Sequence, residues 1–306
     1  QNHKLIRISC GIAAALSGVS ALALATASPA MAQDGDVRAG LDEITVTAQR
    51  REENQQDVPI SITTLPEERL AAILAGADDI RALATRVPGL YAESSNGRVA
   101  PRFYIRGLGN TDFDLAASQP VSIIMDEVVM ENVVLKSFPL FDIAAVEVLR
   151  GPQGTLFGRN TPAGIVKFDT AKPSDEQSGY LSATYGTYNT AKVEGAIGGP
   201  LTDSLAYRVS MLYQRRSDWI DNVGVIQNGF NQIDDAYGGF EDLAGRFQLE
   251  FAPGENFSTL LNFHGRSLDG TSELFRANIF TAGSNDLNGN FDRDQVFYDE
   301  GGGNKQ

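Results

Sequence analysis

Long segments of alternating apolar and polar residues dominate the C-terminal half of the chain. In the segment 205–213 the odd positions are apolar, from Leu205 to Tyr213, while the even positions include Arg208 and Ser210. The segments 243–251 and 257–263 repeat this pattern. A period of two residues is typical of β-strands with one apolar and one polar face. The pattern predicts either a transmembrane β-barrel or a soluble β-sandwich, because both produce the same alternation.

The connections between these segments alternate between short and long. Strands expected at 179–185 and 191–197 meet at a tight turn, and a second short turn spans 198–203. A loop of more than twenty residues, 217–241, then precedes the short turn 253–255 and a long segment from 268 onward. Short turns on one side and long loops on the other are typical of outer-membrane barrels. We therefore expect antiparallel barrel strands in residues 174–306.

The N-terminus has the three parts of a secretory signal peptide. Lys4 and Arg7 precede an uncharged run from Ile8 to Ala27, and small residues follow up to Ala32. This order predicts cleavage after Ala32, whereas the Gly and Ser residues of the run weaken the alternative of an anchoring helix. Cys10, the single cysteine, would leave with the signal peptide, so the mature chain would use no disulfide or thiol.

Residues 58–173 predict a small α+β domain. The segment 60–65 alternates like a strand, and helix starts follow at Pro66 and near Asp78. Further short strands are expected at 103–106, 121–125, 145–149 and 165–170, between Gly- and Pro-rich turns. Ahead of this domain, the β-forming segment 42–48 lies between two polar linkers. We expect it to be a tethered, unpaired strand, because the linker 49–57 is polar throughout and has nothing to bury.

The stretch from Leu140 to Val166, LFDIAAVEVLRGPQGTLFGRNTPAGIV, is the most specific in the chain. It closely resembles the plug signature of TonB-dependent outer-membrane receptors, with Ala163 in place of the first glycine of a usual pair. The segments 104–107 and 121–128 resemble two earlier plug strands, and Glu127 stands where a turn glycine is usual. The segment from Glu43 to Ala48 resembles the TonB box of that family.

The resemblance implies a signal peptide in 1–32, a TonB box and linker in 33–57, a plug domain in 58–173 and a partial β-barrel in 174–306. About five of roughly twenty-two barrel strands would be present. It also implies the outer membrane of a Gram-negative bacterium and TonB-dependent transport of a scarce ligand. A ferric siderophore or another iron complex is the commonest cargo of the family, while haem, cobalamin and glycans use the same architecture.

Site residues carry over from the resemblance. A TonB-type periplasm-spanning protein would pair with the TonB box by main-chain hydrogen bonds, through Glu43, Ile44, Thr45, Val46, Thr47 and Ala48. Two polar loops between plug strands supply the candidates for ligand binding: Ser94, Ser95, Asn96, Arg98, Asn110, Asp112 and Phe113. Arg106 and Arg150 are candidates for pairing with barrel carboxylates, since an unpaired buried guanidinium is costly.

Other chemistries find no support in the sequence. His264 is expected to be a polar residue facing the barrel lumen, and no spacing of metal ligands or catalytic triad is present, so we expect no enzyme, metal or cofactor. The oxygen-rich segment 286–294 lacks the glycine and the glutamate of a calcium loop, which favours a solvated loop. Without the signal peptide 23 basic residues face 39 acidic ones, a net charge of −16 that disfavours nucleic acid.

Two alternatives of other classes are weighed against transport. A signal-transducing receptor needs a periplasmic domain, for which the ten residues between Ala32 and Glu43 are too few. A secreted or surface β-rich adhesin without transport is the second alternative. Five barrel strands cannot close, so the barrel predicts a curved open sheet with two unpaired edges and outward apolar side chains, whereas a closed two-sheet core would indicate the adhesin.

We predict that the mature protein begins at Gln33. The intact mass of receptor purified from outer membranes should correspond to loss of residues 1–32, because the small-residue site ends at Ala32. A mass that retains Cys10 or Met31 would contradict the prediction.

Overall fold

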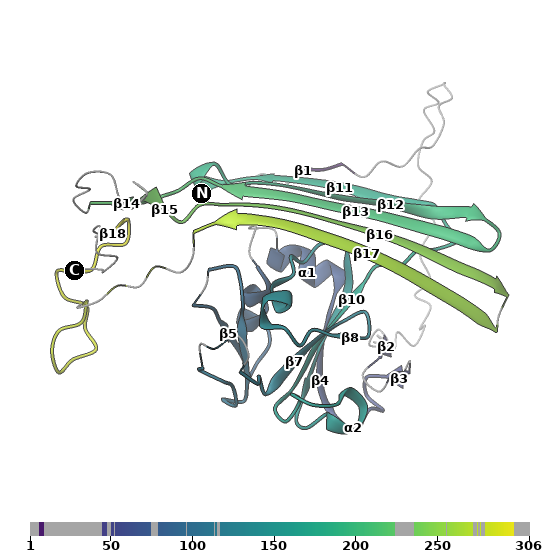
Figure 1. The fold of residues 1–306 in the computed structure, drawn as a ribbon, viewed down its shortest axis with the longest axis horizontal. Helices are drawn as coiled ribbons and strands as arrows, with labels where there is room; N and C mark the ends of the chain where they lie inside the picture. Colours follow the sequence, from purple (N-terminus) through teal and green to yellow (C-terminus); the bar gives the residue numbers. More distant parts are fainter. Residues whose placement is uncertain are drawn as a thin grey trace, which may run out of the picture.

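The computed structural model of the chain describes residues 45–47, 50–51, 53–74, 79–95, 97–112, 114, 117–223, 236–254, 256–271, 274, 276 and 279–296, with the backbone of 6–8. These residues form a compact α+β domain, up to Pro173, and a curved sheet of long strands that lies over it (Figure 1). The predicted cleavage site, Glu43, Ile44, Ala48, Asn96 and Phe113 lie outside the described residues.

A mixed sheet forms the centre of the compact domain. Its strands follow the order β4 (Ser61–Pro66), β9 (Ile143–Arg150), β10 (Gly164–Thr170), β7 (Val121–Met125) and β8 (Val128–Val129). β10 runs parallel to β7, and all other neighbours are antiparallel. The strands expected at 60–65, 121–125, 145–149 and 165–170 are confirmed, with ends that differ by up to two residues.

Both faces of this sheet are buried. On one face Ile123, Val148 and Phe168 belong to the main hydrophobic core, together with Leu70, Leu83 and Phe103. On the opposite face Ile124, Leu149 and Ile165 form a second cluster with Val46, Val58 and Phe157. Strands covered on two faces are buried at successive positions instead of alternating, and all five residues of β7 are buried here, four of them apolar.

Two helices and a hairpin cover the main core: α1 (Glu67–Ile73), the 3-10 helix η2 (Ile80–Thr85), and the hairpin of β5 (Leu90–Glu93) with β6 (Arg102–Ile105). The short helix α2 (Gly154–Phe157) lies on the opposite face, where Phe157 joins the second cluster, and the 3-10 helix η3 (Val133–Ser137) follows β8. Asp79 caps η2, since its carboxylate accepts a hydrogen bond from the amide of Arg81 at 2.9 Å. None of the helices in the described residues is long and apolar enough to cross a membrane.

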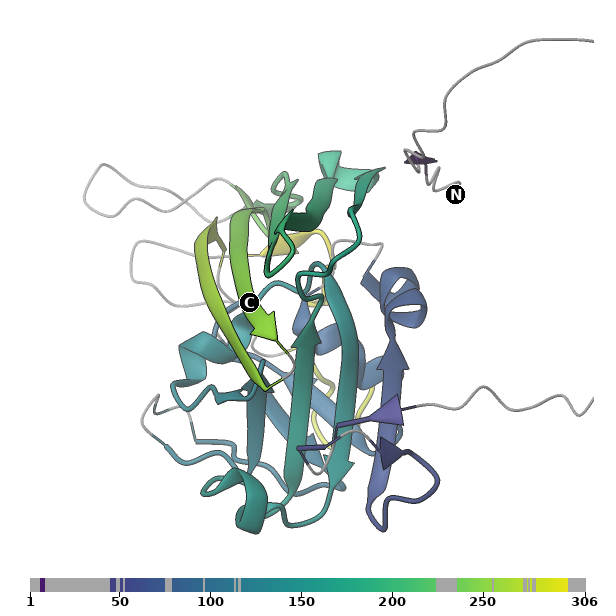
Figure 2. The same cartoon turned by 90° about the vertical axis from the view of Figure 1, so that its right-hand side faces the viewer.

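The curved sheet is an antiparallel meander. β11 (Ser178–Tyr185), β12 (Ala191–Thr202), β13 (Leu205–Arg216), β16 (Phe240–Gly254) and β17 (Phe257–Gly270) pair in chain order. The 3-10 turn η4 (Thr187–Asn189) joins the first two, and β14 (Ile220–Asn222), β15 (Ala236–Tyr237) and β18 (Gln295–Val296) lie beyond one end of the sheet. Figure 2 shows the sheet bending over one side of the compact domain.

The side chains of the curved sheet divide as an open barrel wall requires. Met211, Phe247 and Phe251 are exposed, while Leu212, Arg246 and Gln248 between them are buried toward the compact domain. The expected curved open sheet is therefore confirmed, and the closed two-sheet core of the adhesin alternative is absent from the described residues. His264 faces inward as expected, with its ring 4.6 Å from that of Phe138.

Two expectations from the sequence are wrong. The β11 edge is not free, because β1 (Ile6–Ile8) pairs with it antiparallel, and an open edge is a template for any extended segment. The segment 45–47 is not unpaired either, since β2 (Thr45–Val46) pairs with β3 (Glu53–Asn54) in the linker that was expected to bury nothing. Val46 of this segment packs against the second face of the central sheet.

We predict that Gly164→Ala lowers the free energy of unfolding of the compact domain by about 3 kcal/mol or more. A Cβ at Gly164, whose φ is +143°, would lie 2.2 Å from the carbonyl oxygen of Leu149. Gly151→Ala is the matched control, because its φ of +102° strains the backbone while no atom lies within 4 Å. Trypsin sensitivity of the full-length protein in a urea series would measure both, and equal losses would contradict the prediction.

Candidate functional site

The segment around Val46 is docked on the second face of the central sheet. Val46 is 1% exposed and packs with Val58, Leu149 and Ile165. Full burial of a valine contributes about 1.5–3 kcal/mol. The docked segment therefore covers apolar surface that the sheet would otherwise expose to water.

A cluster of charged side chains holds Thr47 beside this apolar contact. The amide of Thr47 donates to Oε1 of Glu147 at 2.8 Å, and Nζ of Lys167 donates to Oγ1 of Thr47 at 2.5 Å. Lys167 also donates to Asp169 at 2.8 Å and forms an ion pair with Glu127 at 3.0 Å. Glu147 and Lys167 lie opposite each other on β9 and β10, with 2% and 1% of their surfaces exposed.

Burial and charge act differently on the two central residues of this cluster. Burial raises the pKa of Glu147 above its usual value, although the Thr47 amide and Lys167 favour the carboxylate. Burial opposes the charge of Lys167, but Asp169 and Glu127 outweigh it and raise the pKa of its ammonium. Lys167 is therefore a fixed cation that can hold the Thr47 hydroxyl at neutral pH.

The compact domain meets the curved sheet at Asp142, the residue before β9. Arg208 binds its carboxylate in a bidentate pair, with distances of 2.5 and 2.8 Å, and the Ser210 hydroxyl also donates to it. Nη2 of Arg246 donates to the carbonyl of Asp142 at 2.7 Å and to that of Phe141 at 3.1 Å. The Asp142 side chain is 2% exposed.

Asp142 stays ionised in this environment. Burial opposes its charge, but the hydrogen bonds from Arg208 and Ser210 outweigh burial and hold its pKa below the usual value. Its φ of +51° is a left-handed conformation that a short polar side chain tolerates. Beside it, Phe141 packs against Leu212 and Ala244 of the curved sheet.

Further polar contacts extend this interface along the curved sheet. Arg266 donates to the carbonyl of Ser137 at 2.5 Å and pairs with Asp242 at 2.8 Å. Other inward side chains of the sheet bind the compact domain in the same way, namely Lys192 at Leu74, Gln248 at Thr170 and Asn262 at Asp126. Side chains on the inner face of the sheet thus bind the compact domain by donating hydrogen bonds to it.

Comparison with known proteins supplies the family. The family model named TonB-dependent Receptor Plug Domain matches residues 54–165, which include β4, β7, β8 and β9 of the central sheet and the first two residues of β10. The compact domain is the plug of a TonB-dependent receptor. The resemblance stated from the sequence is confirmed, and membership of this family of transporters agrees with the expectation that the chain is not an enzyme.

Relatives and solved structures extend the likeness into the curved sheet. The chain is 28% identical over 243 residues to the pesticin receptor of Yersinia enterocolitica, with 78% of this chain and 33% of the relative covered. It is 30% identical over 234 residues to the ferric enterobactin receptor of Pseudomonas aeruginosa, with 67% and 30% covered. The chain thus spans about a third of the length of these curated relatives.

A solved structure shares the fold of both parts. The ferric yersiniabactin uptake receptor FyuA from Yersinia pestis superposes with a TM-score of 0.62 at 24% identity, over 70% of this chain and 32% of that one. The curved sheet corresponds to part of the barrel of such receptors. The plug and barrel strands expected from the sequence are therefore confirmed as a fold.

The candidate ligand residues lie in loops that their own side chains hold in place. The Ser94 hydroxyl donates to the carbonyl of Val99 at 2.6 Å, and the Ser95 hydroxyl accepts from Arg102 at 2.5 Å. Asn110 donates to the carbonyl of Ser118 at 2.6 Å and accepts from the amide of Asp112 at 2.9 Å. Binding of a ligand by these residues stays a prediction.

Arg98 places the first of these loops against the start of β16 in the curved sheet. Its guanidinium lies 3.9 Å from the ring centre of Phe240, the first residue of β16 after the long connection. Burial lowers the pKa of Arg98, while Asp79 and Asp242 act against that shift. In the same hairpin, burial and a hydrogen bond to Glu93 raise the pKa of Tyr104 to about 12.

Arg106 and Arg150 contact the plug itself in the described structure. Arg106 is exposed and donates to Ser61 at 3.3 Å, whereas Arg150 donates to Thr63 at 2.6 Å and to the carbonyl of Pro88 at 3.1 Å. The ion pairs between the plug and the described strands have the opposite polarity, with the carboxylate on the plug. Pairing of Arg106 and Arg150 with barrel carboxylates stays a prediction.

The sequence analysis missed Asp142, Glu147 and Lys167. Asp142 is part of the plug signature, and Arg208 and Arg246 lie on the polar face of their strands. Nothing in the sequence shows that these residues form ion pairs, because they are far apart along the chain. Glu147 and Lys167 are visible in the sequence as single charges within apolar strands, but only the strand register shows that they lie opposite each other. No group of three or more potential metal ligands occurs in the part of the chain that the structure describes.

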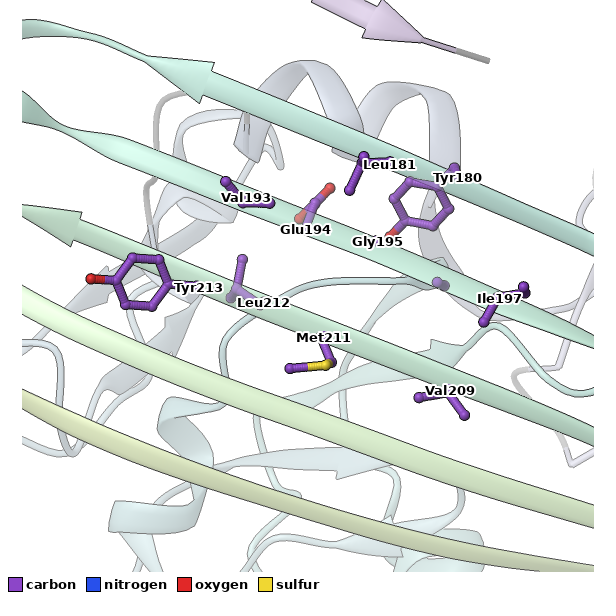
Figure 3. Close-up of a pocket in the computed structure, with 11 residues that line it drawn as sticks. Tyr180, Leu181, Val193, Glu194, Gly195, Ile197, Val209, Met211, Leu212 and Tyr213 are labelled. Carbon is purple, nitrogen blue, oxygen red and sulfur yellow. The ribbon is translucent and has the colours of Figure 1, made fainter. Parts of the chain in front are cut away.

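The outer face of the curved sheet carries a shallow apolar depression. Gly195 lies between Leu181 on β11 and Met211 on β13, and its missing side chain leaves the hollow (Figure 3). Leu181 and Met211 are 60% and 57% exposed on this face. The depression lies away from the plug and belongs to the apolar exterior of the barrel wall.

We predict that Asp142→Asn weakens the attachment of the plug by about 3–5 kcal/mol, because it leaves Arg208 and Arg246 buried without their counter-charge. Glu131→Gln is the matched control, since its ion pair with Arg159 is exposed to solvent and contributes little to stability. The urea concentration at which trypsin cuts the plug of the full-length receptor measures the difference.

The same carboxylate gives the attachment a pH dependence. Since the pKa of Asp142 is lowered in the folded state, its contribution is present above the ordinary pKa of about 4 and is lost as pH falls through the folded value. The Asn variant should lose this acid dependence. An unchanged acid profile in the variant would contradict the role of Asp142.

Proposed function

We propose that this protein transports a scarce ligand, most specifically a ferric siderophore or another iron complex, across the outer membrane of a Gram-negative bacterium. The chain would be exported by the signal peptide 1–32. A TonB-type periplasm-spanning protein would supply the energy by pulling on the TonB box. The observation that carries this proposal is the plug attached to the inner face of barrel strands, with the segment of Thr45, Val46 and Thr47 docked on its surface.

The docked segment has the properties of a releasable strand. β2 contains two residues and pairs only with the equally short β3 in the described structure. An extended segment can add to the edge of a partner's sheet by main-chain hydrogen bonds, but Val46 must first leave its apolar site. Glu43, Ile44 and Ala48 would complete the segment that the TonB-type partner binds.

The cargo class is supported by the name of one relative. The 30% identical receptor of Pseudomonas aeruginosa is named for ferric enterobactin. We propose that the ligand meets the loops of Ser94, Ser95, Asn96 and Arg98 and of Asn110, Asp112 and Phe113. Support for the first loop is its contact with Phe240 at the end of the wall where the long connection lies.

We predict that Val46→Pro abolishes energised uptake by the full-length receptor and leaves ligand binding at the cell surface nearly unchanged. Proline removes a main-chain donor from the strand that the partner would extend. Uptake and binding of radioactive iron presented as a panel of ferric chelates would measure both steps. Gln55→Pro, in the turn after β3, is the matched control and should keep uptake. Loss of surface binding in Val46→Pro would contradict the assignment of the TonB box.

A further inference from the structure

Glu127 occupies a turn that favours glycine. Asp126 and Glu127 form the two-residue connection between β7 and β8, with φ values of +46° and +68°. A two-residue hairpin with both φ values positive prefers glycine or asparagine. A glutamate held in this conformation carries backbone strain, which commonly accompanies a functional role.

The Glu127 carboxylate contacts two residues that hold the segment of Val46 in place, Lys167 and Arg50. Its Oε1 lies 3.0 Å from Nζ of Lys167, which in turn donates to the Thr47 hydroxyl at 2.5 Å. Its Oε2 lies 3.6 Å from Nε of Arg50, three residues beyond Thr47. One side chain of the plug thus engages the segment twice, directly at Arg50 and through Lys167 at Thr47.

Arg50 is positioned for this contact by its own surroundings. Its guanidinium lies 5.1 Å from the ring centre of Phe157, which belongs to the apolar site of Val46. The Arg50 amide donates to the carbonyl of Thr47 at 2.9 Å, so that the chain turns directly after the docked residues. The side chains of Arg50 and Glu127 are 47% and 48% exposed, so their attraction is sensitive to salt.

We propose that Glu127 is a positioning residue that retains the docked segment by bridging Lys167 and Arg50. The inference rests on the proposed function for the identity of this segment as the TonB box. Lys167 remains paired with Asp169 when Glu127 is removed, so the buried ammonium keeps a carboxylate partner. Removal of the Glu127 carboxylate therefore weakens the docking of the segment and leaves the fold of the plug intact.

The release of the segment can be measured directly with a cysteine at position 46. We propose Val46→Cys in the full-length receptor, in a background without other cysteines and purified in detergent, reacted with a polar maleimide in the absence of ligand and TonB. Because Val46 is 1% exposed, the reaction reports undocking. Glu127→Gln and Glu127→Gly should each react about three- to ten-fold faster than the parent.

Two readouts distinguish a specific loss of docking from a general loss of plug structure. Glu127→Gly relieves the positive φ, so its thermal midpoint should equal or exceed that of the parent while its labelling accelerates. Added salt should accelerate labelling of the parent and leave Glu127→Gln nearly unchanged. Glu131→Gln, which removes an exposed ion pair with Arg159, is the matched control and should label like the parent.

The outcomes that overturn the proposal are distinct from those that overturn transport. Equal labelling rates in the parent and both Glu127 variants would refute the bridge, whatever the uptake activity. Faster labelling accompanied by a lower thermal midpoint in Glu127→Gly would assign Glu127 to plug stability instead. Full uptake by Val46→Pro would instead refute the identity of the TonB box and leave the labelling result intact.

Discussion

The two-sided burial of the central plug sheet is the constraint on which the rest of the structure depends. One face packs against the main core, and the other is apolar at Ile124, Leu149 and Ile165 and needs a second cover. In the described structure the N-terminal segment provides it through Val46 and Val58. The segment proposed as the TonB box is therefore also part of the plug's hydrophobic core. Moving the segment exposes the second face of the central sheet to water.

Two attachments of different strength hold the plug. At the curved sheet, Asp142 is enclosed by Arg208, Ser210 and Arg246, and a buried ion pair is expensive to break because each partner is left as an uncompensated charge. At the N-terminal segment, one valine, one threonine and a half-exposed arginine make the contact. The smaller contact of the segment supports the proposal that a pull on the N-terminus releases it before the plug leaves the wall.

Much of the fold could be predicted from particular residues. The alternation of Leu205 to Tyr213 gave the strand and its outward face, since a side chain in a strand has only two directions. The outward face was assigned correctly at Met211 and Phe247. The docking of Val46 could not be predicted, because a single apolar residue among polar linkers shows no partner, and the linker at Glu53 and Asn54 gave no sign of pairing.

The sequence by itself determined the family, the plug strands and the two faces of the barrel strands, because these depend on local periodicity and on contiguous motifs. Only the tertiary structure decided which charges meet. Asp142 and Arg208 are separated by 66 residues, and Thr47 and Lys167 by 120. Such pairs form because the chain path brings them together in a dry interior, where an ion or an amide must find whichever partner is within reach.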